Sequence, residues 1–161
     1  MQADEITTSN QREEVLTFRI GSEHYAVTLL QVQEIRSFEA PTRLANAAPG
    51  VRGCLDLRGT IVTVLDVRTA LGADDGIDAT TATVILTVGG TVCGLVVDAV
   101  DDVVALDAAR IQRPPRIGAG VRLVRGLLTL AASASTPERT LQLLDIPELL
   151  SSYVPASLEA A

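Results

Sequence analysis

The sequence predicts an all-β protein: two SH3-like five-stranded β-barrels packed on a shared hydrophobic core, with a few short helices. Short strand-like segments follow one another along the 161 residues, separated by glycine-containing turns, and this spacing favours a barrel or a sandwich. The chain is 47% hydrophobic but only 2% aromatic, so its core must be aliphatic. The second half also repeats the first in the same order, and each repeat has the size of an SH3-like barrel.

The first half opens with a strand and contains one hairpin that is clearer than the rest. Leu16, Phe18 and Ile20 alternate with polar residues, as in a half-buried strand, and Gly21 begins the next turn. The clear hairpin turns at Arg58 and a glycine. The expected elements are, in order, a strand at 15–20, a strand at 24–30, a short helical or irregular turn at 31–37, a loop at 40–50 and a hairpin at 51–67 that a turn of helix closes.

An internal repeat relates the two halves of the chain. A shift of 68 residues overlays the first hairpin on the second half without a gap, and a shift of 73 overlays 51–57 (VRGCLDL) on 124–130 (VRGLLTL). Apolar matches alone do not establish a repeat, because any two β-hairpins share an alternating apolar pattern. The match of Gly21 with Gly89, together with shared Arg-Gly and Leu-Asp pairs in the same order, favours two similar β-units over coincidence.

The repeat sets the expected domain organisation. Each unit is too small to bury much alone, so their aliphatic faces are expected to pack on each other. The expected parts are a flexible N-terminal tail at 1–14, one domain at 15–152 made of two β-barrel subdomains at approximately 15–71 and 83–150, and a C-terminal tail at 153–161.

Composition excludes several chemistries and partners. All 13 basic residues are arginine, and a chain without lysine cannot hold a Walker-A phosphate loop or a Schiff base. His24 is the one histidine, which excludes a His-cluster metal site. The net charge is −7 and neither half is basic, so no nucleic-acid partner is expected. Cys54 and Cys93 lie far apart in strand-like runs and predict small buried thiols without a disulfide.

One segment of the chain has the length and the lack of charge of a membrane span. Residues 79–97 are uncharged and long enough to span a bilayer. They hold five threonines and a central Gly89-Gly90, which favours a hairpin. The first 14 residues are polar and acidic, unlike a basic-then-apolar leader. No membrane insertion is therefore expected.

The carboxylates offer no convincing catalytic or metal site. Asp66 and Asp145 end strands at matching places, where an acid–base pair is conceivable but capping of the following helical turn is favoured. The acidic run Asp98, Asp101 and Asp102 lacks the calcium-loop pattern and predicts a solvated strand edge. His24 is interpreted as a strand-edge or turn residue, and the Gly118-Ala119-Gly120 segment as a loop without the third glycine of a dinucleotide fingerprint. We therefore expect recognition rather than catalysis.

Two long stretches carry ordered motifs that identify a family. FRIGSEHYAVTLLQVQEIRSF (18–38) and RLANAAPGVRGCLDLRGTIVTVLDVR (43–68), followed by GLVVDAVDDVV (94–104), RGLL and LLDIPELL, closely resemble CheW, the adaptor family of bacterial chemotaxis. The resemblance covers roughly 15–152. The chain departs from the family at Asp56, where Asn is usual, and at Thr63, where Pro is usual.

The resemblance implies a CheW-like domain that is a non-enzymatic scaffold without a cofactor. It would couple chemoreceptors to the histidine kinase CheA in chemotaxis signalling arrays. Its implied partners are the regulatory domain of CheA and the cytoplasmic tip of methyl-accepting chemoreceptors, and its implied location is the cytoplasm, recruited to membrane receptor arrays. Carried over residue by residue, the resemblance assigns receptor binding to Val32, Glu34, Val100 and Val103, and receptor or kinase coupling to Gly53, Arg58, Gly59 and Gly126.

Several alternatives stay open from the sequence. A CheW-like adaptor of a non-flagellar pathway, such as pilus motility or gene control, would carry the same motifs. A receptor-binding part of a larger protein, such as CheV or CheA, and a binder or enzyme built on a barrel are weaker hypotheses. Glu34 lies among apolar residues and Arg58 at a hairpin tip, and the sequence leaves open whether they touch and whether they are buried.

Overall fold

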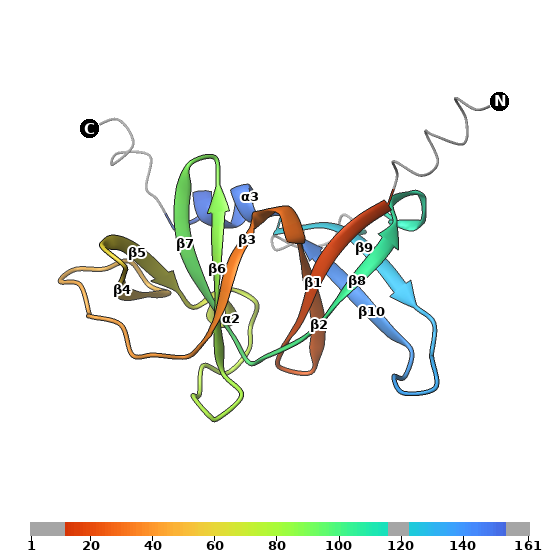
Figure 1. The fold of residues 1–161 in the computed structure, drawn as a ribbon, viewed down its shortest axis with the longest axis horizontal. Coiled ribbons are helices and arrows are strands. Elements are labelled where there is room, and N and C mark those ends of the chain that lie inside the picture. Colours follow the sequence, from red (N-terminus) through yellow and green to blue (C-terminus); the bar gives the residue numbers. More distant parts are fainter. Residues whose placement is uncertain (1–11, 116–122, 154–161) are drawn as a thin grey trace.

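A computed structural model describes residues 12–115 and 123–153, and these residues form two five-stranded β-sheets with short helical turns (Figure 1). The first sheet has the strand order β8-β1-β2-β10-β9, made by β1 (Arg12–Ile20), β2 (Glu23–Thr28), β8 (Ala99–Asp107), β9 (Val124–Leu130) and β10 (Arg139–Leu144). The second has the order β3-β6-β7-β5-β4, made by β3 (Val32–Ser37), β4 (Val51–Leu57), β5 (Thr60–Leu65), β6 (Ala82–Val88) and β7 (Thr91–Val97). The helical elements are η1 (Leu29–Gln31), α2 (Val67–Ala70), η2 (Ala108–Arg110) and α3 (Ile146–Ser151).

Each sheet closes on itself into a barrel. Thr42, beyond the end of β3, pairs with Cys54 of β4, and Gln112, beyond the end of β8, pairs with Leu127 of β9. These bridges join the first and last strand of each sheet. Parallel pairing of β10 with β2 and of β7 with β5 holds the middle of each barrel. The predicted all-β class with two SH3-like barrels is therefore confirmed.

The repeat exists in the structure, but the barrels do not follow it. Strands β1–β5 and β6–β10 occur in the same order in the two repeats. The first barrel, however, combines β1 and β2 with β8, β9 and β10, and the second combines β6 and β7 with β3, β4 and β5. The expectation that 15–71 and 83–150 each form one barrel is therefore wrong. Alternation along a strand fixes which face is buried and not which strand lies beside it, so the exchange left no mark in the sequence pattern.

Two crossovers make this exchange. The chain leaves the first barrel through η1, between β2 and β3, and returns from the second barrel at Asp98, between β7 and β8. Figure 1 shows β3 and β1 near the centre of the molecule, where the two barrels meet. The strands that follow the crossovers, β3 and β8, stand at the first position of their sheets. The two barrels are thus joined by two passages of the chain, one between β2 and β3 and one between β7 and β8.

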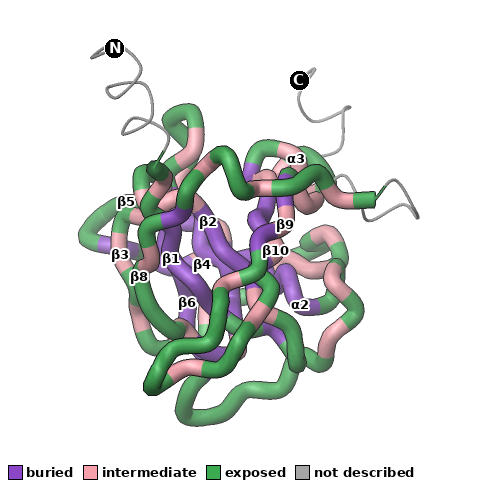
Figure 2. Tube along the Cα trace, turned by 90° about the vertical axis from the view of Figure 1, so that its right-hand side faces the viewer, coloured by how far each residue is buried: buried purple, intermediate pink, exposed green. Residues whose placement is uncertain are grey.

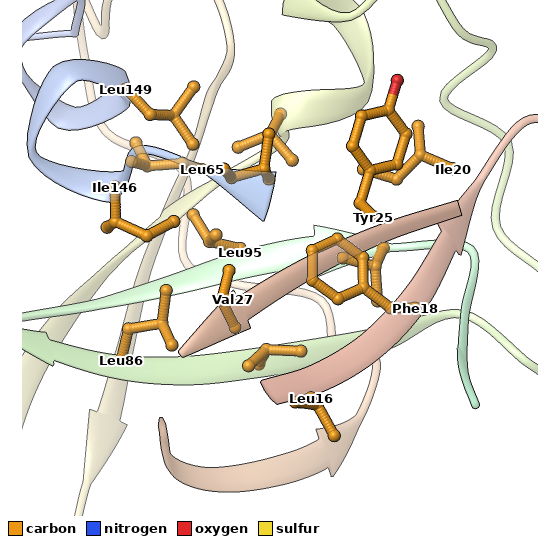
Figure 3. Close-up of a cluster of buried hydrophobic side chains, with 14 of the residues drawn as sticks. Leu16, Phe18, Ile20, Tyr25, Val27, Leu65, Leu86, Leu95, Ile146 and Leu149 are labelled. Atoms are coloured by element: carbon orange, nitrogen blue, oxygen red, sulfur yellow. The ribbon is translucent and has the colours of Figure 1, made fainter. Parts of the chain in front are cut away.

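The core has three parts, and the largest is shared by the barrels. Figure 2 shows the buried segments running through the middle of the molecule. The interior of the first barrel is a cluster of six buried residues around Leu141 and Leu143, and that of the second is a cluster of six around Val62 and Val64. Figure 3 shows the shared cluster, in which Phe18 and Tyr25 from the first barrel pack beside Leu86 and Leu95 from the second. A shared aliphatic core was predicted, and separate barrel interiors accompany it.

Several local expectations are confirmed. Residues 79–97 contain the β6–β7 hairpin, and no helix among the described residues is long and apolar enough to cross a membrane. Asp66 caps α2 by accepting from the Arg68 amide, and Asp145 caps α3 by accepting from the Glu148 amide. Both cysteines are free; Cys93 is buried but Cys54 is only half-buried. The predicted turns of helix after the two strands are therefore formed as capped helices.

Other expectations need correction. The predicted turn at 31–37 is largely strand β3, which pairs with β6 through a bulge. The N-terminal tail is shorter than 1–14, because β1 begins at Arg12. Tyr153 packs against the shared core, so the final tail does not begin there. The Gly118-Ala119-Gly120 loop and the remaining tail residues lie outside the described ranges.

Candidate partner-binding site

The four valine and glutamate candidates lie on two equivalent strands, β3 and β8. A bulge interrupts β3 between Val32 and Glu34, and the pairing of β1 with β8 shifts opposite the segment from Val100 to Val103. Val32 and Val100 are related by the 68-residue repeat, so the two bulges are at matching places. Bulges re-aim side chains and bend a strand. The structure thus gives both barrels the same irregular strand at their junction.

Apolar side chains on these elements range from half-buried to fully exposed. Val32 and Val100 are partly buried and pack against the shared core, while Val103 is 48% exposed. Ile35 of β3 is 46% exposed and Leu30 of η1 is 96% exposed. Sequence reasoning did not single out Leu30 or Ile35, although the 68-residue repeat pairs Ile35 with Val103. Exposed apolar groups beside a packed junction are typical of a surface that another protein covers.

A groove of about 630 Å³ lies beside Leu30. Its walls include Arg12, Glu13 and Glu14 of β1 and Leu29 and Leu30 of η1. The groove therefore has charged groups on one side and aliphatic groups on the other. Such a lining suits an amphipathic helix better than a small polar ligand.

Glu34 and Arg58 touch, and the contact is at the surface. Arg58 Nη2 donates to Glu34 Oε1 at 2.5 Å, and Arg36 Nη1 donates to Glu34 Oε2 at 3.2 Å. The Arg58 side chain is 69% exposed, whereas that of Glu34 is 24% exposed. The hydrogen bond from Arg58 is the main cause that lowers the pKa of Glu34. Glu34 is therefore a fixed anion between two arginines, of which Arg36 was not foreseen.

The hairpin tip that presents Arg58 has a specific backbone shape. Arg58 and Gly59 both have positive φ, at 53° and 91°, as in the tight turns that suit a two-residue hairpin loop. The Gly59 amide donates to Asp56 Oδ1 at 2.8 Å. Asp56, a departure from the family pattern, thus closes the turn with its carboxylate. The space around Gly59 is open, so its requirement is the backbone angle alone.

Gly53 and Gly126 have a different role, because both are buried where a barrel closes. A Cβ on Gly53 would lie 2.0 Å from the Thr42 carbonyl oxygen, and a Cβ on Gly126 would lie 2.4 Å from Ile111 Cγ2. Each glycine lets a segment from earlier in the chain, at Thr42 or at Ile111, pass close to its strand. The structure buries both residues, so neither glycine is itself part of an exposed surface.

The acidic residues of β8 lie exposed on the first strand of their sheet, as the expected solvated edge requires, and they also form ion pairs that were not predicted. Arg19 Nε donates to Asp101 Oδ1 at 3.2 Å, and Arg139 Nη2 donates to Asp102 Oδ2 at 3.1 Å. His24 is half-buried, with Nδ1 3.7 Å from Asp101 Oδ2. Glu34 and Asp102 are related by the 68-residue repeat. On each of the strands β3 and β8, an acidic residue near the apolar side chains therefore binds an arginine: Glu34 binds Arg58, and Asp102 binds Arg139.

The arrangement of the remaining carboxylates gives no catalytic constellation. Asp66 and Asp145 use their carboxylates to cap helices, as described above. Asp98 is paired with the buried Arg68, whose Nη1 donates to Asp98 Oδ1 at 2.8 Å. Within residues 12–115 and 123–153, no cluster of three or more histidine, cysteine or acidic side chains could hold a metal ion. The site that the geometry does build is an apolar junction flanked by ion pairs.

Comparisons with known proteins give the chain its relatives. The CheW-like domain model matches residues 14–154. The chain is 39% identical to the chemotaxis protein CheW of Klebsiella aerogenes over 87% of this chain and 82% of that protein, and 31% identical to the probable chemotaxis protein CheW of Rhizobium etli over 73% and 77%.

A solved structure shares the fold. The scaffolding protein TtCheW from Thermoanaerobacter tengcongensis superposes with a TM-score of 0.74 at 22% identity, covering 83% of this chain and 84% of that one. The predicted resemblance is therefore confirmed over most of the chain. Together with two exchanged SH3-like barrels and an apolar junction between them, these matches show that the chain belongs to the CheW-like family of chemotaxis adaptors.

Proposed function

We propose that this chemotaxis adaptor is a non-enzymatic bridge between the cytoplasmic tip of methyl-accepting chemoreceptors and the regulatory domain of the histidine kinase CheA. One observation carries the proposal: β3 holds the partly buried Val32 on the same strand as the Glu34–Arg58 ion pair, and the equivalent strand β8 of the other barrel holds Val100, which packs on the same shared core, and the exposed Val103. A helix with one apolar face would cover the valines and Leu30, and its polar flank would meet the charged groups.

Glu34 and Arg58 give the proposed receptor site its charge pattern. Glu34 is held between Arg58 and Arg36, so a receptor helix meets a net positive group of three side chains. Complementary charges across an interface select partners more than they add affinity. We propose that a receptor tip places an acidic side chain near Arg58, which is the most exposed of the three.

The coupling to the kinase is proposed for the hairpin and barrel-closing glycines. Gly59 and Arg58 form an exposed tip, while Gly53 and Gly126 hold the closures beneath. A rigid hairpin edge of this kind can add to a barrel of similar shape without large rearrangement. Recruitment to receptor arrays follows from these two contacts and needs no membrane segment. The alternative of a pilus or gene-control pathway is not favoured, since the relatives named above are chemotaxis proteins.

Replacement of Glu34 by lysine tests the receptor site. Glu34→Lys removes the acceptor that holds Arg58 and Arg36 in place and puts a repelling cation between them, so Arg58 would leave the position in which it meets the acidic side chain of the receptor. Affinity for a receptor cytoplasmic tip should therefore fall at least ~tenfold, a change of about 1.4 kcal/mol. Isothermal titration of the chain with a purified receptor tip measures it, and circular dichroism checks the fold.

Glu39→Lys is the matched control. Glu39 is 62% exposed and contacts Arg36 at 3.4 Å, so the charge change is the same while the Arg58 pair stays intact. Its affinity should remain near that of the unsubstituted chain. Equal affinities for Glu34→Lys and the unsubstituted chain would show that the receptor binds elsewhere.

A further inference from the structure

Arg68 is a fully buried cation whose every donor is used. Its Nε and Nη2 donate to the two oxygens of Asp66, each at 2.8 Å. Its Nη1 donates to Asp98 Oδ1 at 2.8 Å and to the Gly76 carbonyl at 2.6 Å, and its Nη2 also donates to the Asp75 carbonyl at 2.9 Å. The hydrogen bonds that Arg68 donates to Asp66 are the main cause that raises the pKa of Arg68 above its ordinary value, so it stays charged.

This cluster extends across the boundary between the barrels. Arg68 belongs to α2, which follows β5 of the second barrel. Asp98 lies at the β7–β8 crossover, and its second oxygen, Oδ2, accepts from the Gly21 amide at 2.6 Å. Gly21 is in the β1–β2 turn of the first barrel, and the Asp98 amide in turn donates to the Arg19 carbonyl. One carboxylate therefore ties a buried cation of one barrel to the backbone of the other.

At the β2–β3 crossover, the described residues form no such link. By the repeat, Leu30 stands where Asp98 stands, Gly89 where Gly21 stands and Pro147 where Arg68 stands. Leu30 is 96% exposed. Around η1 the barrels meet through Leu29 and other apolar side chains of the shared core. Apolar contacts are non-directional, whereas a buried, fully bonded ion cluster has one geometry.

We propose that the Arg68–Asp98–Gly21 link is a one-sided clamp that fixes the relative orientation of the two barrels at the β7–β8 crossover. Loss of the charge on Asp98 leaves the Arg68 guanidinium buried beside an incomplete set of acceptors, and the Gly21 amide loses a charged acceptor. The orientation of the barrels at this crossover then rests on the apolar core and on the backbone hydrogen bond from the Asp98 amide to the Arg19 carbonyl. The clamp goes beyond the proposed adaptor function and does not depend on it.

Residual dipolar couplings of backbone amides test the clamp on the intact chain in solution. In the unsubstituted protein, a single alignment tensor should fit the amides of both barrels. In Asp98→Asn the two barrels should require different tensors, and exchange of the Gly21 amide should accelerate about tenfold, as expected for one lost hydrogen bond to a charged group. Asp75→Asn is the matched control, since Arg68 contacts only the backbone carbonyl of Asp75 and the side chain is 69% exposed.

The outcomes separate cleanly. A single tensor in Asp98→Asn, or equal effects of Asp98→Asn and Asp75→Asn, overturns the clamp. If Asp98→Asn fails to fold, the unsubstituted chain still tests the clamp. Its Gly21 amide must exchange about tenfold more slowly than the amide of Gly89, which is the equivalent of Gly21 in the repeat. Equal exchange of the two amides would refute the link. Neither measurement uses a receptor or a kinase, so failure of the adaptor function leaves this test unaffected.

Discussion

Asp66 is a nearly buried carboxylate that two arginines hold. Burial raises the pKa of Asp66, but the hydrogen bonds from Arg68 and Arg52 outweigh it, so the folded pKa is below its usual 3.8. A group whose folded pKa is depressed stabilises the fold above its unfolded pKa, and this stability is lost as the pH falls through the folded pKa. The free energy of unfolding should therefore drop as the pH falls below 3.8. Urea denaturation at a series of pH values measures it.

Asp66→Asn isolates this carboxylate. It should cost about 3–5 kcal/mol at neutral pH, because it removes the bidentate partner of the buried Arg68 charge and leaves Asp98 as the one carboxylate bonded to it. The difference between Asp66→Asn and the unsubstituted chain should then narrow in acid. Two stability curves that stay parallel down to acid pH would show that Asp66 does not carry this dependence.

The ion pair of Arg58 with Glu34 is exposed, in contrast to the buried ion pair of Asp66 with Arg68. The side chain is 69% exposed, so Arg58→Ala should leave the melting temperature nearly unchanged. Arg68→Ala, which removes a fully buried cation, should lower it strongly or prevent folding. Differential scanning fluorimetry of the two variants makes the comparison. A large loss with Arg58→Ala would mean that the Glu34 pair supports the fold as well as a partner.

At the scale of single elements, the glycines of β4 and of its hairpin tip should respond differently to substitution. Gly59→Ala adds a methyl group in open space at φ 91°, so it should cost about 1–2 kcal/mol of backbone strain. Gly53→Ala adds one 2.0 Å from the Thr42 carbonyl oxygen, where backbone must move, so it should cost more than about 3 kcal/mol. Chemical denaturation of both variants tests this. Equal costs would remove the barrel-closure explanation for Gly53.

The hairpins could be predicted from the sequence because alternation and turn glycines are local signals. The strand β3 could not be predicted in this way. Leu29, Val32 and Ile35 recur every three residues, a helical spacing, because a bulge between Val32 and Glu34 breaks the alternation. Its pairing with β6 over a long sequence separation decides its conformation. Leu30 lies just before this bulge in η1, and its exposure depends on the fold rather than on any local pattern.

At the scale of the whole molecule, the repeat predicted two β-units, but it did not predict that each barrel combines strands from both repeats. Matching glycines and Arg-Gly pairs revealed the order of elements, while partner choice depends on the β2–β3 and β7–β8 crossovers. The Arg68 cluster shows the same limit. Its acceptors come from α2, the loop after it and the β7–β8 crossover, and charged residues that meet only in the folded chain have no sequence signature.

The central claim is that one chain joins two other proteins through separate surfaces without changing either chemically. Sedimentation velocity of the chain mixed with the CheA regulatory domain and a receptor cytoplasmic tip tests it most directly. We predict one species that contains all three components. With Glu34→Lys, the chain should still bind the CheA regulatory domain but should no longer bind the receptor tip. Displacement of one partner by the other, or no association with either, would contradict the bridge.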